Sequence, residues 1–275
     1  MSSLKFTIIQ TDLTWEDKGA NLETLSKKIM SIDEPTEIIV LPEMFTTGFS
    51  MQPSLFAESM EGPTIQWMRR LSELKKSIIT GSIIIEENGK YYNRLIWMLP
   101  NGQFGYYDKR HLFAFAGEDA FYSEGNKRLI ASVKGWKINL QVCFDLRFPV
   151  WARQQLTPST VHGTLANDVA VSNLEYDVLL YVANWPEKRN KAWKTLLTAR
   201  AIENQCFTIG VNRVGMDGKN IMHSGDSMVI SPLGDVLYHC AYEEDIFHIT
   251  LQKDELTKNR EQFPFWKNAD IFNIE

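Results

Sequence analysis

Two uninterrupted apolar runs constrain the fold of this chain more than any other feature. They lie in TEIIVLPE at residues 36–43 and in DVLLYVANWP at residues 177–186. A strand with one face in a core alternates apolar and polar residues, whereas a strand that is apolar throughout is buried on both faces. The chain must therefore build sheets that other layers cover on both sides.

Helical segments alternate with the strands. Apolar residues recur at helical spacing around residues 21–29, 63–77 and 189–205. Further strands are expected at residues 5–12, 137–144 and 206–214. No internal repeat and no linker rich in glycine and serine interrupts this order. It predicts an α/β fold, with mixed sheets layered with helices, in a single domain over residues 1–275.

Two Asn-Gly pairs divide the stretch after the second helix into three short strands. These strands, SIITGSIII, YYNRLIWML and QFGYYDK, are separated by ENGK and PNGQ. Because Asn-Gly is the strongest short-range signal for a hairpin turn, we expect a three-stranded meander that ends at Lys109. A second hairpin is expected over residues 227–240, around Pro232-Leu233-Gly234.

The charge balance and the hydropathy pattern argue against several classes of protein. The 275 residues include 29 lysines and arginines and 34 acidic residues, a net charge of −5 with no basic block. A surface that binds nucleic acid is therefore not expected. No apolar run reaches the roughly 18 residues of a membrane span. The start, MSSLKFTIIQTD, lacks the features of a signal peptide, so we expect a cytoplasmic protein without membrane contact.

The cysteines and histidines do not form the pattern of a disulfide framework or of a metal site. The three cysteines, an odd number, lie far apart at Cys143, Cys206 and Cys240. No two of the five histidines lie at ligand spacing on one helical face. We expect no metal and no other cofactor. Cys206 is expected in the core, and His111 and His223 on the surface; the alternative for both histidines is a hydrogen-bonding role at the edge of the site.

Three reactive side chains lie at the predicted ends of strands, where the sites of α/β proteins gather. Glu43 ends an apolar run, Lys109 ends the meander, and Cys143 follows the strand INLQV. A thiol is an effective nucleophile when a carboxylate accepts its proton and an ammonium group stabilises the oxyanion that forms. Singly, each residue has an ordinary interpretation: a turn acid, a solvated surface charge and a small core residue.

Together with their neighbours these residues form three motifs in one order: LPEMFTTGF, YDKRHLF followed by GE, and CFDLRFP. The chain resembles the carbon–nitrogen hydrolase (nitrilase) superfamily, and most of all its omega-amidase-like branch. The similarity continues through YVANWP, LLTARAIENQCFTIGVNRVG and GDSMVISPLGDVL, so it covers nearly the whole chain. It implies a four-layer αββα sandwich and assembly as a homodimer or a larger homo-oligomer.

The resemblance also implies roles for residues in the motifs. Glu43 would be the general base, Lys109 the cation that stabilises the oxyanion, and Cys143 the nucleophile. Glu118, in FAGED, would be a second carboxylate that positions the base or the substrate; the alternative is an acid on a surface loop. The backbone N–H of Phe144 would complete the oxyanion hole.

The omega-amidase-like branch implies hydrolysis of short amides whose far end carries a carboxylate, such as 2-oxoglutaramate, through a cysteine thioester. A carboxylate that leaves water needs a cation, and Arg147 can bind one with two parallel hydrogen bonds. The alternative for Arg147 is an ion pair with Asp145 or another acid that braces the turn. The other residues expected in the pocket are Asn184, Trp185, Phe49 and Phe115.

Two other functions stay open at this point. One is another enzyme of the same superfamily, either an amidase of other small amides or a nitrilase that converts nitriles to acids through the same thioester. The other is a non-catalytic relative on the same fold, against which the intact Glu43, Lys109 and Cys143 argue.

Two segments remain without a defined role. The stretch 155–175, rich in Thr, Ser, Asn and Gly, is expected to be a long loop. It would cover the site, contact another subunit or form a simple surface insertion. Residues of about 245–275 are expected to form a C-terminal extension.

Overall fold

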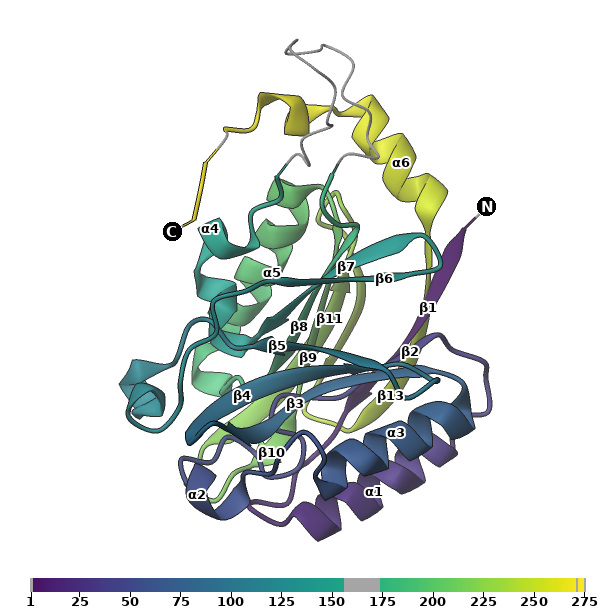
Figure 1. The fold of residues 1–275 in the computed structure, drawn as a ribbon. Coiled ribbons are helices and arrows are strands. Elements are labelled where there is room, and N and C mark those ends of the chain that lie inside the picture. Colours follow the sequence, from purple (N-terminus) through teal and green to yellow (C-terminus); the bar gives the residue numbers. More distant parts are fainter. Residues whose placement is uncertain (1, 156–173, 271, 275) are drawn as a thin grey trace.

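Two β-sheets packed on each other form the centre of the molecule (Figure 1). The computed structural model describes residues 2–155, 174–270 and 272–274. In that part of the chain the first sheet has six strands in the order β13-β1-β2-β3-β4-β5. The second sheet has seven, because β12 pairs with β11 beside the order β10-β11-β9-β8-β7-β6.

Both sheets have parallel strands at their centres. The first sheet consists of β1 (Ser3–Gln10), β2 (Ile38–Val40), β3 (Ile78–Glu87), β4 (Lys90–Met98), β5 (Phe104–Asp108) and β13 (Asp245–Gln252). The second consists of β6 (Leu129–Val133), β7 (Trp136–Val142), β8 (Val178–Ala183), β9 (Phe207–Asn212), β10 (Val214–Met216), β11 (Met222–Ile230) and β12 (Val236–Ala241). β1, β2 and β3 run parallel, as do β7, β8 and β9. The carboxyl ends of these central strands carry the site.

Helices cover the outer face of each sheet. α1 (Lys18–Met30) and α3 (Pro63–Lys75) lie along the first sheet, and α5 (Asn190–Asn204) lies along the second with α4 (Pro149–Ala152) beside it (Figure 1). α2 (Pro53–Phe56) and α6 (Lys253–Gln262) lie at the periphery. The predicted αββα sandwich is confirmed.

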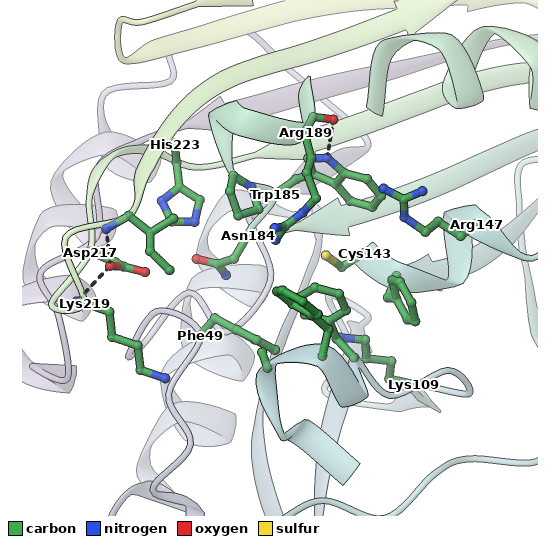
Figure 2. A pocket seen from close by; sticks show the side chains of 16 residues that line it. Phe49, Lys109, Cys143, Arg147, Asn184, Trp185, Arg189, Asp217, Lys219 and His223 are labelled. Atoms are coloured by element: carbon green, nitrogen blue, oxygen red, sulfur yellow. Dashed lines mark hydrogen bonds between the residues drawn. The ribbon is translucent and has the colours of Figure 1, made fainter. Parts of the chain in front are cut away.

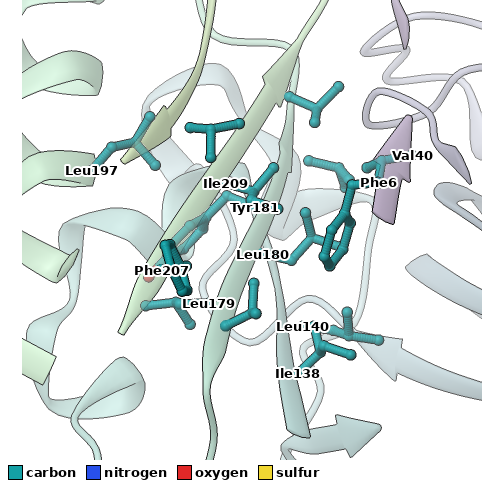
Figure 3. Packing of buried hydrophobic residues seen from close by; sticks show 14 of the residues in the cluster. Phe6, Val40, Ile138, Leu140, Leu179, Leu180, Tyr181, Leu197, Phe207 and Ile209 are labelled. Carbon is teal, nitrogen blue, oxygen red and sulfur yellow. The ribbon is translucent and has the colours of Figure 1, made fainter. Parts of the chain in front are cut away.

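The strand β2 shows why covering layers are needed. Ile38 and Val40 belong to the core between the sheets, while Ile39 and Leu41 belong to the core beneath α1 and α3. Successive side chains of a strand point to opposite faces, so an entirely apolar run needs both faces buried. Figure 3 shows Val40 and Leu180, which come from different sheets, in the central core.

The predicted meander and the predicted hairpin are confirmed. β3, β4 and β5 are antiparallel neighbours. Asn88 and Gly89, between β3 and β4, have φ values of +55° and +72°, as the two-residue turn that matches hairpin twist requires. β11 and β12 form the second hairpin, with Gly234 at φ +94° in its turn.

Two predicted strands end earlier than expected. β2 stops at Val40, because Pro42 has no N–H with which to continue the ladder. Glu43 therefore lies in the turn that follows this strand. β7 stops at Val142, and Cys143 begins the 3₁₀ helix η3 (Cys143–Arg147). Both reactive side chains thus leave strand geometry at the edge of a sheet.

The predicted loop at 155–175 lies almost entirely outside the described residues, and its role stays a prediction. The predicted C-terminal extension begins within the first sheet, since Asp245–Gln252 pairs along its length with β1 as β13. The single-domain organisation also stays a prediction. In the parts of the chain that the structure describes, no helix is both long and apolar enough to cross a membrane.

Candidate active site

A cavity of about 290 Å³ opens at the carboxyl ends of the central strands (Figure 2). Its walls come from segments that follow β2, β5, β7 and β8 and from the connection between β10 and β11. Of the predicted site residues, the following line it: Phe49, Lys109, Phe115, Cys143, Phe144, Arg147, Asn184 and Trp185. Glu43 and Glu118 are fully buried beneath the cavity, in contact with Lys109.

Cys143 lies on a tight turn between β7 and η3. Its φ of +45° is in the left-handed region, which residues with a Cβ rarely adopt. Val142 before it still has extended geometry. The chain therefore turns sharply at Cys143 and presents the thiol to the cavity (Figure 2). Strain of this kind persists only where the surroundings hold it in place.

Asp145 holds this turn. Its buried carboxylate accepts hydrogen bonds from the N–H of Val142 at 3.0 Å and from the N–H of His111 at 2.9 Å. The hydroxyl of Tyr107 donates to it at 2.7 Å, and Nδ1 of His111 lies 2.8 Å away. One side chain thus joins the turn of Cys143 to the segment that follows β5.

Glu43 is fixed by donors from three parts of the chain. Oε2 accepts the backbone N–H of Asn184 at 2.7 Å. Oε1 accepts Nδ2 of Asn93 at 2.8 Å and Nζ of Lys109 at 3.0 Å. The side-chain amide of Asn184 also donates to the backbone carbonyl of Glu43. The carboxylate therefore has one orientation before any substrate binds.

Lys109 lies between two buried carboxylates. Its Nζ is 3.0 Å from Oε1 of Glu43 and 2.8 Å from Oε2 of Glu118. The N–H of Phe113 donates to Oε2 of Glu118 at 2.6 Å. The structure therefore places Glu118 in the buried network and not on the surface.

The charges of this network set the protonation of the thiol. Burial, and next the charge of Glu43, raise the pKa of Cys143 well above its usual value, so the resting thiol is protonated. Burial alone would lower the pKa of Lys109, but the carboxylates of Glu118 and Glu43 outweigh it and raise that pKa. Burial also raises the pKa of Glu118. A nucleophilic Cys143 has to transfer its proton during attack, and Glu43 is the neighbouring carboxylate.

Two donors are available for an oxyanion at the thiol. Lys109 lines the cavity beside Cys143. Phe144 is the second residue of η3, and N–H groups at the start of a helix have no partner within it. Its ring packs against Phe113 and Phe148, with centroids 4.8 Å and 5.2 Å apart.

Arg147 lies at the mouth of the cavity and is exposed. Its guanidinium lies over the ring of Trp185, 5.2 Å from the centroid. Within residues 2–155, 174–270 and 272–274 it has no ion pair with a carboxylate. Asp145, the alternative partner, binds Tyr107 and His111 instead. The bracing ion pair is therefore not formed.

The remaining predicted pocket residues have different surroundings. Asn184 donates twice to Glu43, and its Oδ1 has no hydrogen-bond partner in the described part of the chain. The ring of Phe49 forms the inner wall, with Nζ of Lys109 5.1 Å from its centroid. Phe115, in η1 (Ala114–Ala116), is 88% exposed and forms the rim.

A model of the carbon–nitrogen hydrolase family matches residues 5–260, which is most of the chain. The protein belongs to the carbon–nitrogen hydrolase family. The resemblance indicated by the three motifs is thereby confirmed.

Individual relatives of this carbon–nitrogen hydrolase match along nearly the full chain. It is 39% identical to the omega-amidase YafV of Escherichia coli K12 over 275 residues, 100% of both chains. It is 30% identical to the 2-oxoglutaramate amidase of Bacillus subtilis 168 over 266 residues, 95% of this chain and 96% of the relative. A CN-hydrolase superfamily protein from Xanthomonas campestris, with an arsenic adduct in its active site, has 39% identity and a TM-score of 0.92 over 100% of both chains.

The cavity of this carbon–nitrogen hydrolase contains an arginine that the motifs did not indicate. Arg189 ends the 3₁₀ helix η5 (Glu187–Arg189) and lines the cavity together with Trp185 and Phe113. Its guanidinium lies 5.0 Å from the centroid of Phe113. Arg189 comes soon after the end of β8. The tendency of functional groups to gather beyond the carboxyl ends of strands could therefore have indicated it. The adjacent Lys188 carries the same signal, and the sequence alone does not choose between them.

The expectation that His223 is a surface residue was wrong. In β11 its neighbour Met222 faces outward while His223 is buried, and it lines the far end of the cavity with Asp217 and Lys219. Burial, and then the charge of Arg213, lower the pKa of His223 to about 4, so it is uncharged at neutral pH.

The other expectations about histidine and cysteine had mixed outcomes. His111 is half-buried and bound to Asp145, and not fully on the surface. Cys206 lies in the central core, as predicted. Cys240 is buried in β12, away from the cavity. Among the residues that the structure describes, no three His, Cys, Asp or Glu side chains group as metal ligands would.

Proposed function

We propose that this protein is an omega-amidase, which hydrolyses the terminal amide of short dicarboxylic acids such as 2-oxoglutaramate to the acid and ammonia. The observation that carries the proposal is the meeting of Glu43, Lys109 and Cys143 at the bottom of one small cavity. The omega-amidase of Escherichia coli and the 2-oxoglutaramate amidase of Bacillus subtilis, which are similar along nearly the whole chain, support it.

The first half of the reaction forms a thioester. The sulfur of Cys143 attacks the amide carbon while its proton passes to Glu43. The amide oxygen becomes an oxyanion that accepts hydrogen bonds from Nζ of Lys109 and from the N–H of Phe144. Glu43 then gives the proton to the nitrogen, the C–N bond breaks, and ammonia leaves with the acyl group on the sulfur.

The second half hydrolyses the thioester. Glu43 takes a proton from the water that attacks the carbonyl, and the same two donors stabilise the second oxyanion. The C–S bond breaks, the carboxylic acid is released, and the proton returns from Glu43 to the sulfur of Cys143. Glu118 positions Lys109, whose raised pKa keeps it charged throughout the cycle.

The size and charge of the cavity favour a small anionic substrate. A volume of about 290 Å³ is at the lower end of the range for small-molecule sites. Arg147, without an ion pair in the described part of the chain, would bind the carboxylate with its two parallel N–H groups. Phe49 and Phe115 would contact the methylene groups, with Trp185 beneath the guanidinium.

Ammonia release from a panel of small compounds tests the proposal. We expect the purified protein to hydrolyse 2-oxoglutaramate and glutaramate much faster than butyramide, which lacks the carboxylate, and faster than the matching nitrile. Intact-mass measurement should detect an adduct equal to the substrate minus ammonia on the wild-type protein.

Cysteine variants provide the matched control for this experiment. Cys143→Ala should release no ammonia and form no adduct. Cys240→Ala should retain most of the activity, because that thiol is buried away from the cavity. Ammonia production by Cys143→Ala, or no turnover of any omega-amide by the wild type, would contradict the proposal.

Assembly as a homodimer or larger homo-oligomer and a cytoplasmic location also stay predictions. Light scattering of the purified protein tests the first and cell fractionation the second. We further expect full activity after dialysis against a chelator, since the proposed cycle uses only groups of this chain and water.

A further inference from the structure

Two guanidinium groups face the cavity. Arg147 comes from the end of η3 and Arg189 from the end of η5, and both line the cavity with Cys143. Figure 2 shows the two side chains approaching Cys143 from different sides of Trp185. Arg147 is exposed and Arg189 is half-buried, so Arg189 is the less accessible of the two.

Neither guanidinium has a carboxylate partner within residues 2–155, 174–270 and 272–274. Their neighbours are aromatic faces, Trp185 for Arg147 and Phe113 for Arg189. Burial lowers the pKa of Arg189, Cys143 acts in the opposite direction, and the charge of Arg147 lowers this pKa further, so the two guanidinium groups repel each other. The buried arginines of the described chain do have carboxylate partners: Arg94, Arg200, Arg213 and Arg260.

Four cations line the cavity, and one of them, Lys219, lies at the far end with Asp217 and His223 (Figure 2). A 2-oxo acid amide offers one acceptor group for each of the other three. Its amide oxygen belongs at the reacting end, beside Lys109. Its carboxylate, the outermost group, accepts two parallel hydrogen bonds from one guanidinium, for which the exposed Arg147 is in the right place. The 2-oxo oxygen is one carbon nearer to the reacting carbon. Of the three cations nearer to Cys143, the one that remains for it is the less accessible Arg189.

We propose that Arg189 is a specificity-determining residue that donates a hydrogen bond to the 2-oxo oxygen of the substrate. This inference rests on the proposed omega-amidase function and deepens it. An amide without the 2-oxo group leaves the half-buried guanidinium without an acceptor, and a 2-amino group places an ammonium beside two guanidinium groups. The cavity therefore selects 2-oxo acid amides over glutaramate, and more strongly over glutamine.

Kinetics of two variants on three substrates separate the roles of the arginines. We expect Arg189→Gln to lose about 10- to 100-fold in kcat/KM on 2-oxoglutaramate, the effect of one charge-assisted hydrogen bond. Its kcat/KM on glutaramate should change by less than about threefold. Arg147→Gln should instead lose similar factors on both acids, because both carry the far carboxylate, and leave butyramide unchanged.

Two further variants control for charge and for folding. Lys188→Gln removes the adjacent exposed cation, which does not line the cavity, and should keep wild-type rates on all three substrates. Arg189→Lys should recover part of the preference for the 2-oxo acid, since it restores a charged donor. Equal losses of Arg189→Gln on both acids, or no loss on 2-oxoglutaramate, would overturn the inference. A wild-type protein that releases ammonia from neither acid would instead refute the proposed function.

Discussion

Charged side chains are paired at the closed end of the cavity, whereas those toward its mouth have no carboxylate partner in the described part of the chain. At the closed end Glu43, Lys109 and Glu118 are almost completely buried, and Nζ of Lys109 is within 3.0 Å of both carboxylates. Toward the mouth, the half-buried Arg189 and the exposed Arg147 have no carboxylate partner in the described part of the chain and contact aromatic rings. The closed end is complete without substrate, whereas the mouth gains its counter-ion only from a ligand.

This difference matches two roles of a cation: one must be in place before the reaction begins, and the other must be free to bind the substrate. A cation that stabilises an oxyanion acts best when it is in place beforehand and needs no reorganisation during attack. A cation that recognises the carboxylate of a substrate binds it best when it has no partner within the protein. If it had one, that ion pair would have to break first, and binding would be weaker. We therefore expect substitutions at the closed end to change kcat and stability, and substitutions at the mouth to change KM.

Removing the cation of the closed end should have the largest effect. Lys109→Met keeps a similar side-chain length, but leaves Glu43 and Glu118 without a counter-ion. We expect kcat to fall by about 10²- to 10³-fold and the free energy of unfolding to fall by about 3–5 kcal/mol. Steady-state ammonia release and denaturant unfolding measure these quantities.

The control for Lys109→Met is a lysine on the surface. Lys134 forms a partly exposed ion pair with Glu37, and Lys134→Met should change the free energy of unfolding by less than about 1 kcal/mol. Similar losses of stability in both variants would remove the contrast between the buried network and ordinary surface charges.

The far end of the cavity should make stability depend on pH. The pKa of His223 is about 4 in the folded protein against 6.5 for the ordinary side chain, because of burial and then of the charge of Arg213; Asp217 acts in the opposite direction. The unfolded chain takes up the proton first as pH falls. The contribution of the uncharged His223 to the free energy of unfolding is therefore fully present above pH 6.5 and is lost as the pH falls to about 4. The total loss is about 3 kcal/mol.

Urea unfolding of the wild type and of His223→Gln between about pH 7 and about pH 4 measures this effect. The free energy of unfolding of the variant, relative to the wild type, should rise by about 3 kcal/mol over this interval. A difference that does not vary with pH would mean that His223 does not titrate in the way its surroundings indicate.

Weakening the support of the Cys143 turn should have a smaller effect. In Asp145→Asn, an NH2 donor replaces one of the two oxygens that accept hydrogen bonds, so the groups that donate to that oxygen lose their acceptor. We expect the free energy of unfolding to fall by about 2 kcal/mol and kcat to fall by about tenfold, with little change in KM. The matched control is Asp226→Asn, a buried aspartate away from the cavity, which should lower stability without lowering kcat.

Truncating the rim should have the smallest effect. Phe115 is 88% exposed, so Phe115→Ala should change the free energy of unfolding by no more than about 0.5 kcal/mol. We expect KM to rise by about two- to threefold through the loss of apolar contact, with kcat unchanged. A tenfold or larger fall in kcat would show that the rim takes part in the chemistry, contrary to the division between the two ends.

Much of the fold and part of the site could be predicted, because the signals are local. Apolar runs predicted strands that are buried on both faces, and Asn88-Gly89 predicted the first turn of the meander. The positions of Lys109 and Cys143 at the ends of strands, together with the motifs, predicted that both lie in one site, and both line the cavity. The apolar pattern placed the end of β2 too late, because Pro42 ends this strand sooner. Arg189 was missed, because the segment after β8 does not show which of its cations turns inward.

The sequence by itself determined the layered α/β architecture and the family, and it supplied the candidates for the reactive groups. Only the tertiary structure decided which charges are paired. Glu43 meets the backbone of Asn184, 141 positions away, and Asp145 binds His111 and not Arg147. Hydrophobic periodicity and turn chemistry act over a few residues and can be read along the chain. The partner of a charge depends on which distant groups packing brings within hydrogen-bonding distance, and no local pattern records that.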